Sequence, residues 1–456
     1  MKETIKKVLQ KNRSFYAQVQ IEKRIITFFS LSNSSIEQLE SRQVLMGNIY
    51  VLKNGQWGFV AFNDMQNLES CLRQAEKQAD DISRFARQKR QILTSRPVIQ
   101  DFRTDFHIDP DHVSLEEKYK LAGNYDSLLK VYKKLQNRKI YYADRKETIY
   151  YGNTEGSLVK QDKIFSGILI QAVAKEGNNI QIATESFGGY QGYEALKGLE
   201  EKVRKVGKTA TDMLKARAIQ GGRYTVILDP KLAGVFVHEA FGHLSEADHI
   251  FENEKLRKIM KIGKTFGREG LHIIDEGNIP SEAGSIFIDN EGVLPQKTYL
   301  IKDGILNSRL HSRETAWKMK EELTGNARSI DPFHIPIVRM TNTYIDKGSY
   351  SFQEMVDSVD NGIYAVDFHG GQTNLEMFTF SAGRAFRIEK GKIKEMLKNV
   401  VLSGNVFQTL QNIDMIGNDL QLFGGLGGCG KSGQSPLPVS TGSPHIKINN
   451  VLIGGV

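Results

Sequence analysis

The chain contains few residues of the kinds that mark secreted, membrane-spanning or disordered proteins. Only two of its 456 residues are cysteine and only ten are proline, which excludes a disulfide-rich framework and a proline-rich unstructured chain. No apolar run approaches the ~18 residues that could cross a bilayer. The basic N-terminus is not followed by the apolar segment of a signal peptide. We therefore expect a cytoplasmic protein without membrane segments.

Charge is also nearly balanced along the sequence. Lys and Arg number 61 and Asp and Glu number 53, a formal excess of +8, and the basic residues alternate with acids, as in LEEKVRKVGK, without forming a long block. Nucleic-acid binding therefore has no support from composition. With 40% hydrophobic residues over this length, the chain is expected to fold into two to three domains.

The first half of the sequence has the patterns of a mixed helix and strand domain. The segments SFYAQVQI, RIITFFS and GQWGFVAF are typical of strands, because aromatic and β-branched residues dominate them. Helices are predicted over residues 65–88, from the capping box at Ser114 to about residue 137, and over 193–219. Strand-like segments such as KIYYADRK and NIQIATESF lie between the last two helices.

Most of the 42 glycines lie in the second half, which predicts many turns and short strands there. The boundary is placed where Gly221 and Gly222 end the helical pattern. The predicted fold is α+β with two domains. Residues 1–220 form a domain with a mixed or antiparallel sheet and long helices, and residues 221–456 form a glycine-rich, strand-rich domain.

A motif with catalytic chemistry opens the second domain. Asp229-Pro230 predicts a helix that begins at Pro230 and contains His238-Glu239-Ala-Phe-Gly-His243. Histidines five residues apart diverge by about 140° on a regular α-helix, at about 100° per residue. They can share a metal only if the helix is locally irregular, through a π-bulge or a bent end, and Gly242 is the residue expected to tolerate that backbone.

These residue types suit hydrolysis at a metal. Two imidazoles and a third ligand hold a divalent ion, and an open position keeps a water molecule whose pKa the ion lowers. Glu239 would accept the proton of that water and pass it to the leaving amine. The residue pattern leaves the third ligand open between the nearby Glu246, Asp248 and His249 and the distant Cys429.

Cys429 also lies within a sequence that mimics a nucleotide-binding loop. Residues 425–432, GLGGCGKS, satisfy the phosphate-loop pattern. That loop requires a helix to begin at its Lys-Ser, and Pro436 and Pro438 follow too closely for one to form. Nucleotide binding is therefore not expected.

With these segments considered together, the sequence resembles the TldD/PmbA family of metalloproteases over nearly its whole length. The segments that carry the resemblance include VILDPKLAGVFVHEAFGHLSEAD, IDNEGVLPQKTYLIKDGIL, FHGGQTN and the tail CGKSGQSPLPVSTGSPHIKINNVLIGGV. The resemblance implies that His238, His243 and Cys429 hold Zn²⁺ and that Glu239 is the general base. Glu246 and Asp248 would either accept hydrogen bonds from the ligand imidazoles or have a structural role at the end of the helix.

The resemblance further implies a zinc metallopeptidase that hydrolyses unfolded or leader-type peptides. Because this sequence has the histidine motif that TldE or PmbA-like members lack, it resembles the catalytic subunit. A heterodimer with such a non-catalytic paralogue, or a homodimer, is expected. The alternative is a non-enzymatic, partner-binding regulator with a structural metal. A metal held by four protein ligands would favour this alternative, whereas three ligands and a bound water would favour catalysis.

Overall fold

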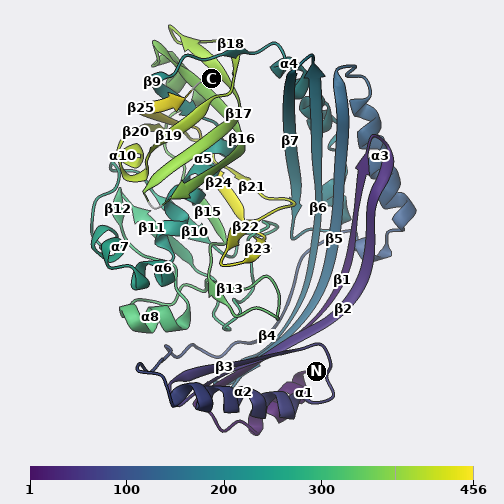
Figure 1. Ribbon diagram of the computed structural model, residues 1–456, viewed down its shortest axis with the longest axis vertical. Coiled ribbons are helices and arrows are strands. Elements are labelled where there is room, and N and C mark those ends of the chain that lie inside the picture. The colour runs from purple at the N-terminus through teal and green to yellow at the C-terminus, as the bar shows by residue number, and fades with distance from the viewer. Residues whose placement is uncertain (375, 455–456) are drawn as a thin grey trace.

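The computed structural model of the protein describes residues 1–374 and 376–454 and shows helices and several separate sheets (Figure 1). The predicted α+β class is confirmed. The strands before residue 190 pair only among themselves, and those after residue 216 pair only among themselves, in the described part of the chain. The division into two domains at residue 220 stays a prediction.

The N-terminal sheet consists of seven strands, in the order β3-β2-β1-β5-β6-β4 with β7 also paired to β6. Four of the strands have 17 to 19 residues, and in Figure 1 they run along one side of the molecule. All neighbours are antiparallel except β4 and β6. The strands are β1 (Tyr16–Ser32), β2 (Ser35–Lys53), β3 (Gln56–Phe62), β4 (Ile99–Arg103), β5 (Leu135–Asn153), β6 (Leu158–Glu176) and β7 (Asn179–Gly189).

Four helices cover parts of this sheet and form two apolar clusters with it. Helices α1 (Lys2–Gln10) and α2 (Leu68–Ser83) pack with β1, β2 and β3 at one end, around Ile5 and Leu72. Helices α3 (Leu115–Leu129) and α4 (Glu200–Met213) pack with β5 and β6 elsewhere on the sheet, around Tyr125 and Val203. The two ends of the long strands are therefore stabilised by different helices.

Two of the predicted helices end in the wrong place. The helix capped by the Ser114 hydroxyl stops at Leu129, and β5 already begins at Leu135. The helix predicted over 193–219 is a short 3₁₀ turn, Tyr193–Leu196, followed by α4. The sequence near residue 135 forms strand because it pairs with β6, and such tertiary pairing overrides local helix propensity.

The C-terminal part contains an eight-stranded sheet in which β16, β9, β25, β19 and β17 pair in a closed ring. Its interior holds part of the largest apolar cluster, including Phe378 and Phe380. The strands of this sheet are β8 (Arg217–Ala218), β9 (Gly222–Leu228), β16 (Asn361–Asn374), β17 (Met377–Glu389), β18 (Lys392–Lys398), β19 (Val401–Asn405), β20 (Ile413–Ile416) and β25 (Ile446–Gly454).

A six-stranded sheet and two hairpins complete this part. The sheet has the order β12-β11-β10-β15-β24-β21 and consists of β10 (Ile273–Glu276), β11 (Lys297–Lys302), β12 (Ile305–Leu306), β15 (Asn342–Ile345), β21 (Gln421–Phe423) and β24 (Ser440–Ser443). The two-stranded pairs are β13 (Ala327–Arg328) with β14 (Ile337–Val338) and β22 (Cys429–Lys431) with β23 (Gln434–Leu437). The Lys-Ser of the phosphate-loop pattern therefore ends a strand and begins no helix.

Helix α5 (Pro230–Val237) lies between these two sheets and contacts β16 and β24. It begins where Asp229-Pro230 predicts, and the Asp229 carboxylate accepts the N–H of Leu232 at 2.9 Å. Phe236 packs edge-on against Phe378 inside the apolar cluster. The buried helix thus holds the residues after it in a defined place.

The remaining helices are short: α6 (Ala247–Glu252), α7 (Glu254–Ile259), α8 (Arg313–Met319), α9 (Phe352–Asp357) and α10 (Val406–Gln411). Among the described residues, no helix has both the length and the apolar character needed to span a bilayer.

Candidate metal centre

The two motif histidines lie on one face because the helix changes its period between them. Residues His238–Gly242 form a π-helical turn directly after α5, and the N–H of His243 donates to the carbonyl of His238. This i→i+5 bond marks one extra residue in the turn compared with an α-helix, so side chains five residues apart come close together. The two imidazole rings have their centroids 5.3 Å apart. The irregularity that the spacing requires is present as a π-bulge.

Gly242 is needed in this turn for a different reason from the predicted one. Its backbone has φ −57° and ψ −53°, which any residue adopts. The expectation that Gly242 relieves an unusual backbone is therefore wrong. A Cβ atom at this position would lie 2.0 Å from Sδ of the buried Met340. Glycine at position 242 leaves the space that the buried side chain of Met340 fills against the π-turn.

Replacing Gly242 by alanine is expected to destabilise the protein by roughly 1–3 kcal/mol, because the overlap with Met340 must be relieved by moving packed groups. Denaturant unfolding would measure this change. Gly123→Ala in α3 is the matched control, since a Cβ atom there meets nothing within 4 Å. Equal stability of the two variants would contradict the packing explanation.

Cys429 joins the histidines from a position 186 residues away in the chain. Its Sγ lies 3.2 Å from Nε2 of His243, and one donor atom from each of the three residues lies within 4.8 Å of the other two. The hairpin that carries Cys429 is anchored by the buried Arg339, which donates to the carbonyls of Cys429 (2.7 Å) and Gln434 (3.2 Å). The structure thus groups Cys429, and neither Asp248 nor His249, with the two histidines.

The thiol of Cys429 and the imidazole of His243 each favour the charged form of the other. Burial opposes ionisation of Cys429, but hydrogen bonds from His238 and His243 lower the pKa of the thiol to about 5. Burial likewise opposes protonation of His243, yet bonds to Cys429 and Glu246 raise its pKa to about 10. A thiolate is the form of cysteine that binds metals.

These donors fit a zinc ion. Two imidazoles and one thiolate are ligands that zinc accepts, and three protein ligands leave one tetrahedral position open. The buried Nδ1 of His238 has no hydrogen-bond partner among the described residues. An unsatisfied buried nitrogen costs about 1–3 kcal/mol, so the imidazole of His238 has unused bonding capacity.

Glu239 lies beside the three donors and is accessible to solvent. Its Oε2 is 3.8 Å from Nε2 of His243, and a third of its side-chain surface is exposed. The carboxylate can therefore reach a water molecule near the donors. Among the described residues, no carboxylate, that of Glu239 included, belongs to the His238, His243 and Cys429 cluster itself.

Glu246 and Asp248 were both expected to orient the ligand imidazoles, and Glu246 contacts the imidazole of His243. Its Oε2 lies 3.0 Å from Nδ1 of His243, and its side chain is fully buried. Burial opposes its ionisation, but the bonds from His243 and Lys431 keep its pKa below the ordinary value. Asp248 instead accepts two hydrogen bonds of 2.8 Å from Lys431.

Lys431 is a residue whose role the sequence did not reveal. Its buried Nζ donates to Asp248 and to the carbonyl of Val338 at 2.8 Å and lies 3.1 Å from Oε2 of Glu246. It connects the strand that carries Cys429 to the acid that contacts His243. The only signal in the sequence was its position two residues after Cys429. The Gly-Lys-Ser pattern around it instead suggested a lysine that binds phosphate.

The variant Lys431→Met is expected to destabilise the fold by about 3–5 kcal/mol, because it removes the buried ammonium group that both Glu246 and Asp248 contact. Chemical denaturation would measure the loss. Lys261→Met, at an exposed position in the same half of the chain, should stay within about 0.5 kcal/mol of wild type. A loss no larger than that of this control would show that Lys431 is dispensable.

Three profiles of one protein family together match most of the chain. Profiles described as PmbA/TldA metallopeptidase domain 1, central domain and C-terminal domain match residues 17–79, 108–218 and 221–455. A metalloprotease of Synechocystis sp. is 40% identical over 96% of this chain and 95% of its own length. A zinc metalloprotease TldD homolog of Saccharolobus solfataricus is 30% identical over 90% of this chain and 89% of its own.

Solved structures share the fold at low sequence identity. A protein described as a modulator of DNA gyrase from Thermotoga maritima has a TM-score of 0.82 and 19% identity, covering 99% of both chains. TldE from Thermococcus kodakarensis has a TM-score of 0.79 and 16% identity, covering 99% of this chain and 100% of its own. Taken with the family profiles and the curated metalloproteases, these matches show that the chain belongs to the PmbA/TldD family of metallopeptidases.

Proposed function

We propose that this chain is a zinc-dependent peptidase of the HExxxH type. His238, His243 and Cys429 are its metal ligands, and Glu239 is its general base. The observation that carries the proposal is the convergence of three donor atoms within 4.8 Å beside an accessible carboxylate. A relative that is 30% identical is named a zinc metalloprotease, which supports zinc as the ion.

A bound zinc ion would supply the Lewis acid that activates water and polarises the peptide carbonyl. The residues of the chain do the rest. Glu239 takes the proton from water and returns it to the leaving amine. Glu246 holds His243 by its Nδ1, which keeps Nε2 directed at the thiolate of Cys429. Lys431 keeps Glu246 in place and compensates its buried charge.

Three donors rather than four favour catalysis over a structural metal. The cluster found among the described residues contains His238, His243 and Cys429 alone. A closed structural zinc site has four protein ligands, whereas a catalytic one leaves a position for water or substrate. The non-enzymatic alternative would need a fourth ligand, and the described residues group none with these three.

The substrates that we propose are unfolded or leader-type peptides, cleaved in the cytoplasm. Pairing with a non-catalytic TldE-like paralogue or with a second copy of the chain completes the proposal, and the fold similarity to TldE of Thermococcus kodakarensis supports a partner of that kind. The chain would divide into functional domains at residue 220, with the metal ligands all in the second.

Metal removal tests the proposed activity. The purified protein, alone and mixed with its paralogue, is incubated with a fluorogenic unfolded peptide before and after chelation. Hydrolysis is expected to stop after chelation and to return with stoichiometric zinc. Hydrolysis that persists in the chelated protein, with metal loss verified by elemental analysis, would refute a metal-dependent mechanism.

A further inference from the structure

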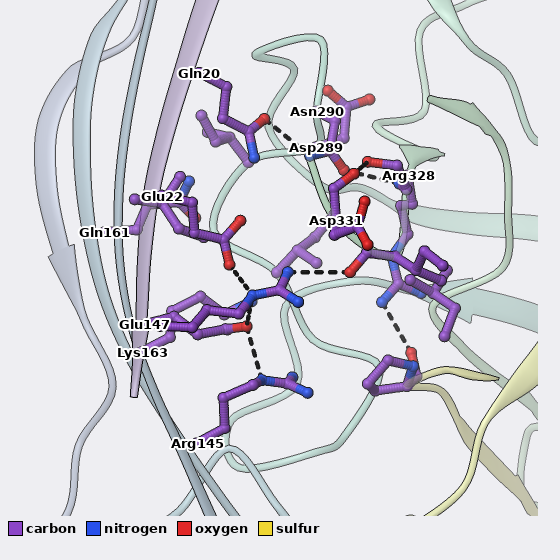
Figure 2. Close-up of a pocket in the computed structure, with 18 of the residues that line it drawn as sticks. Gln20, Glu22, Arg145, Glu147, Gln161, Lys163, Asp289, Asn290, Arg328 and Asp331 are labelled. Carbon is purple, nitrogen blue, oxygen red and sulfur yellow. Dashed lines mark hydrogen bonds and ion pairs between the residues drawn. The ribbon is translucent and has the colours of Figure 1, made fainter. Parts of the chain in front are cut away.

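A polar cavity of about 310 Å³ lies between the long sheet and the C-terminal part of the chain (Figure 2). Strands β1, β5 and β6 supply one wall, with Glu22, Glu147 and Lys163 directed inward, and loops and strands after residue 285 supply the other, with Asp289 and Arg328. Its volume is within the range of small-ligand sites. None of the three proposed metal ligands lines it.

The acids on the sheet wall are already neutralised by arginines of the same wall. Glu22 forms an ion pair with Nε of Arg24. Glu147 lies 3.1 Å from the same Nε and 2.7 Å from Nε of Arg145. These two carboxylates and two guanidinium groups balance one another and leave no net charge.

The two acids on the opposite wall, Asp289 and Asp331, already have hydrogen-bond partners of their own. Asp289 accepts three backbone N–H groups, at 2.9, 2.9 and 3.1 Å. Asp331 accepts one backbone N–H at 2.8 Å and lies 2.7 Å from Nδ1 of His334. Both carboxylates therefore serve to hold their own loops.

Two cations of the cavity have no such partner. Among residues 1–374 and 376–454, neither Lys163 nor Arg328 has a carboxylate oxygen within 4.0 Å, although both are buried. Lys163 Nζ lies 3.9 Å from the ring centroid of Tyr190. Arg328 donates to the carbonyls of Met340 and Pro438, and burial lowers its pKa to about 10. Buried cations that no carboxylate contacts directly favour an anionic ligand.

The cavity adjoins the strand that carries Cys429. In the β22–β23 hairpin Cys429 is paired with Leu437, and Leu437 and Pro438 both line the cavity. The carbonyl of Pro438 is the one that Arg328 holds at 2.8 Å. A ligand in the cavity would therefore lie against the hairpin of the metal centre.

We propose that this cavity binds a carboxylate group of a peptide, received by Lys163 and Arg328. The ammonium of Lys163 offers a point charge, and the guanidinium of Arg328 offers the N–H groups that do not bind Met340 and Pro438. The amide of Gln161 lines the same space, as does that of Gln20, whose Oε1 accepts from Asn290 at 3.0 Å. The identification of the ligand as a peptide rests on the proposed function. The carboxylate is either the C-terminus or an acidic side chain.

Calorimetric titration of the full chain tests the site without requiring turnover. The probes are N-acetyl-dialanine as free acid, the same dipeptide as amide, and an N-acetyl-Asp-Ala amide. The free acid or the Asp-containing amide is expected to bind at least about tenfold more tightly than the uncharged amide, which identifies the terminus or the side chain as the source.

Lys163→Met is expected to weaken the carboxylate probe by about tenfold or more and to leave the uncharged amide unchanged. Lys160→Met on the same strand is the matched control, because Lys160 faces away from the cavity and is paired with Asp162 at 2.5 Å. It should bind all probes as wild type does.

Equal binding of charged and uncharged probes by the wild-type protein, or no binding of either, would overturn the proposal without any variant. Binding of inorganic phosphate in place of the peptide probes would also overturn it and assign the cavity to a phosphate. If the carboxylate probes bind but no peptide is hydrolysed, the site stands and only the proposed peptidase activity fails.

Discussion

Replacing Glu239 by glutamine is expected to lower kcat for peptide hydrolysis by about 10²- to 10⁴-fold, the usual contribution of a general base. Glutamine has nearly the same shape but cannot accept a proton. Because Glu239 lies outside the His238, His243 and Cys429 cluster, at 3.8 Å from His243 Nε2, metal content and stability should not change. Steady-state kinetics with elemental analysis of the same sample would measure both quantities.

Glu252→Gln provides the matched control, since Glu252 is exposed at the end of α6 and should keep wild-type kinetics. Retained hydrolysis in Glu239→Gln, at wild-type metal content, would remove Glu239 from the mechanism. Loss of metal together with activity would instead give Glu239 a binding role, which its distance from the donors does not predict.

Replacing Cys429 by alanine is expected to weaken zinc binding by more than about 100-fold. The variant removes a direct ligand, and even outer partners of ligands contribute about 10–100-fold. The thiolate lies 3.2 Å from Nε2 of His243, and no thiol or carboxylate among the described residues is placed to replace it. Elemental mass spectrometry on protein purified without a histidine tag should find about one zinc per wild-type chain and little in the variant.

Cys71→Ala is the control, because Cys71 is the only other cysteine and lies half-buried in α2. It should retain zinc as wild type does. Zinc retained by Cys429→Ala would transfer the third ligand to Glu246, Asp248 or His249. If neither wild type nor any variant contains metal, the non-enzymatic, partner-binding function becomes the better explanation of the protein.

Local sequence patterns correctly predicted helix boundaries at positions where one or two residues restrict the backbone conformation. Asp229-Pro230 placed the start of α5 correctly, because a capping carboxylate and a proline at the first helical position act within one turn. Pro436 and Pro438 correctly excluded a helix after Lys431. The helix ends at residues 129 and 213 were missed, since the segments after them pair with distant strands.

The sequence by itself determined the chemistry available at the centre: two histidines five residues apart, a glutamate between them and one glycine-flanked cysteine. The five-residue spacing also required an irregular helix, because an α-helix separates such side chains by about 140°. These are properties of a short segment and of side-chain types, which are read without knowing what packs against them.

Only the tertiary structure decided which groups meet. It brings Cys429 across 186 residues to His243 and gives the imidazole contact to Glu246 and not to Asp248. It also places Lys163 and Arg328 in one cavity, where no carboxylate oxygen of the described residues lies within 4.0 Å of either. Each of these contacts depends on strand pairing and on the packing of sheets that are far apart in the chain. Such contacts arise from burial and hydrogen bonding over the whole molecule, so no local window of sequence contains them.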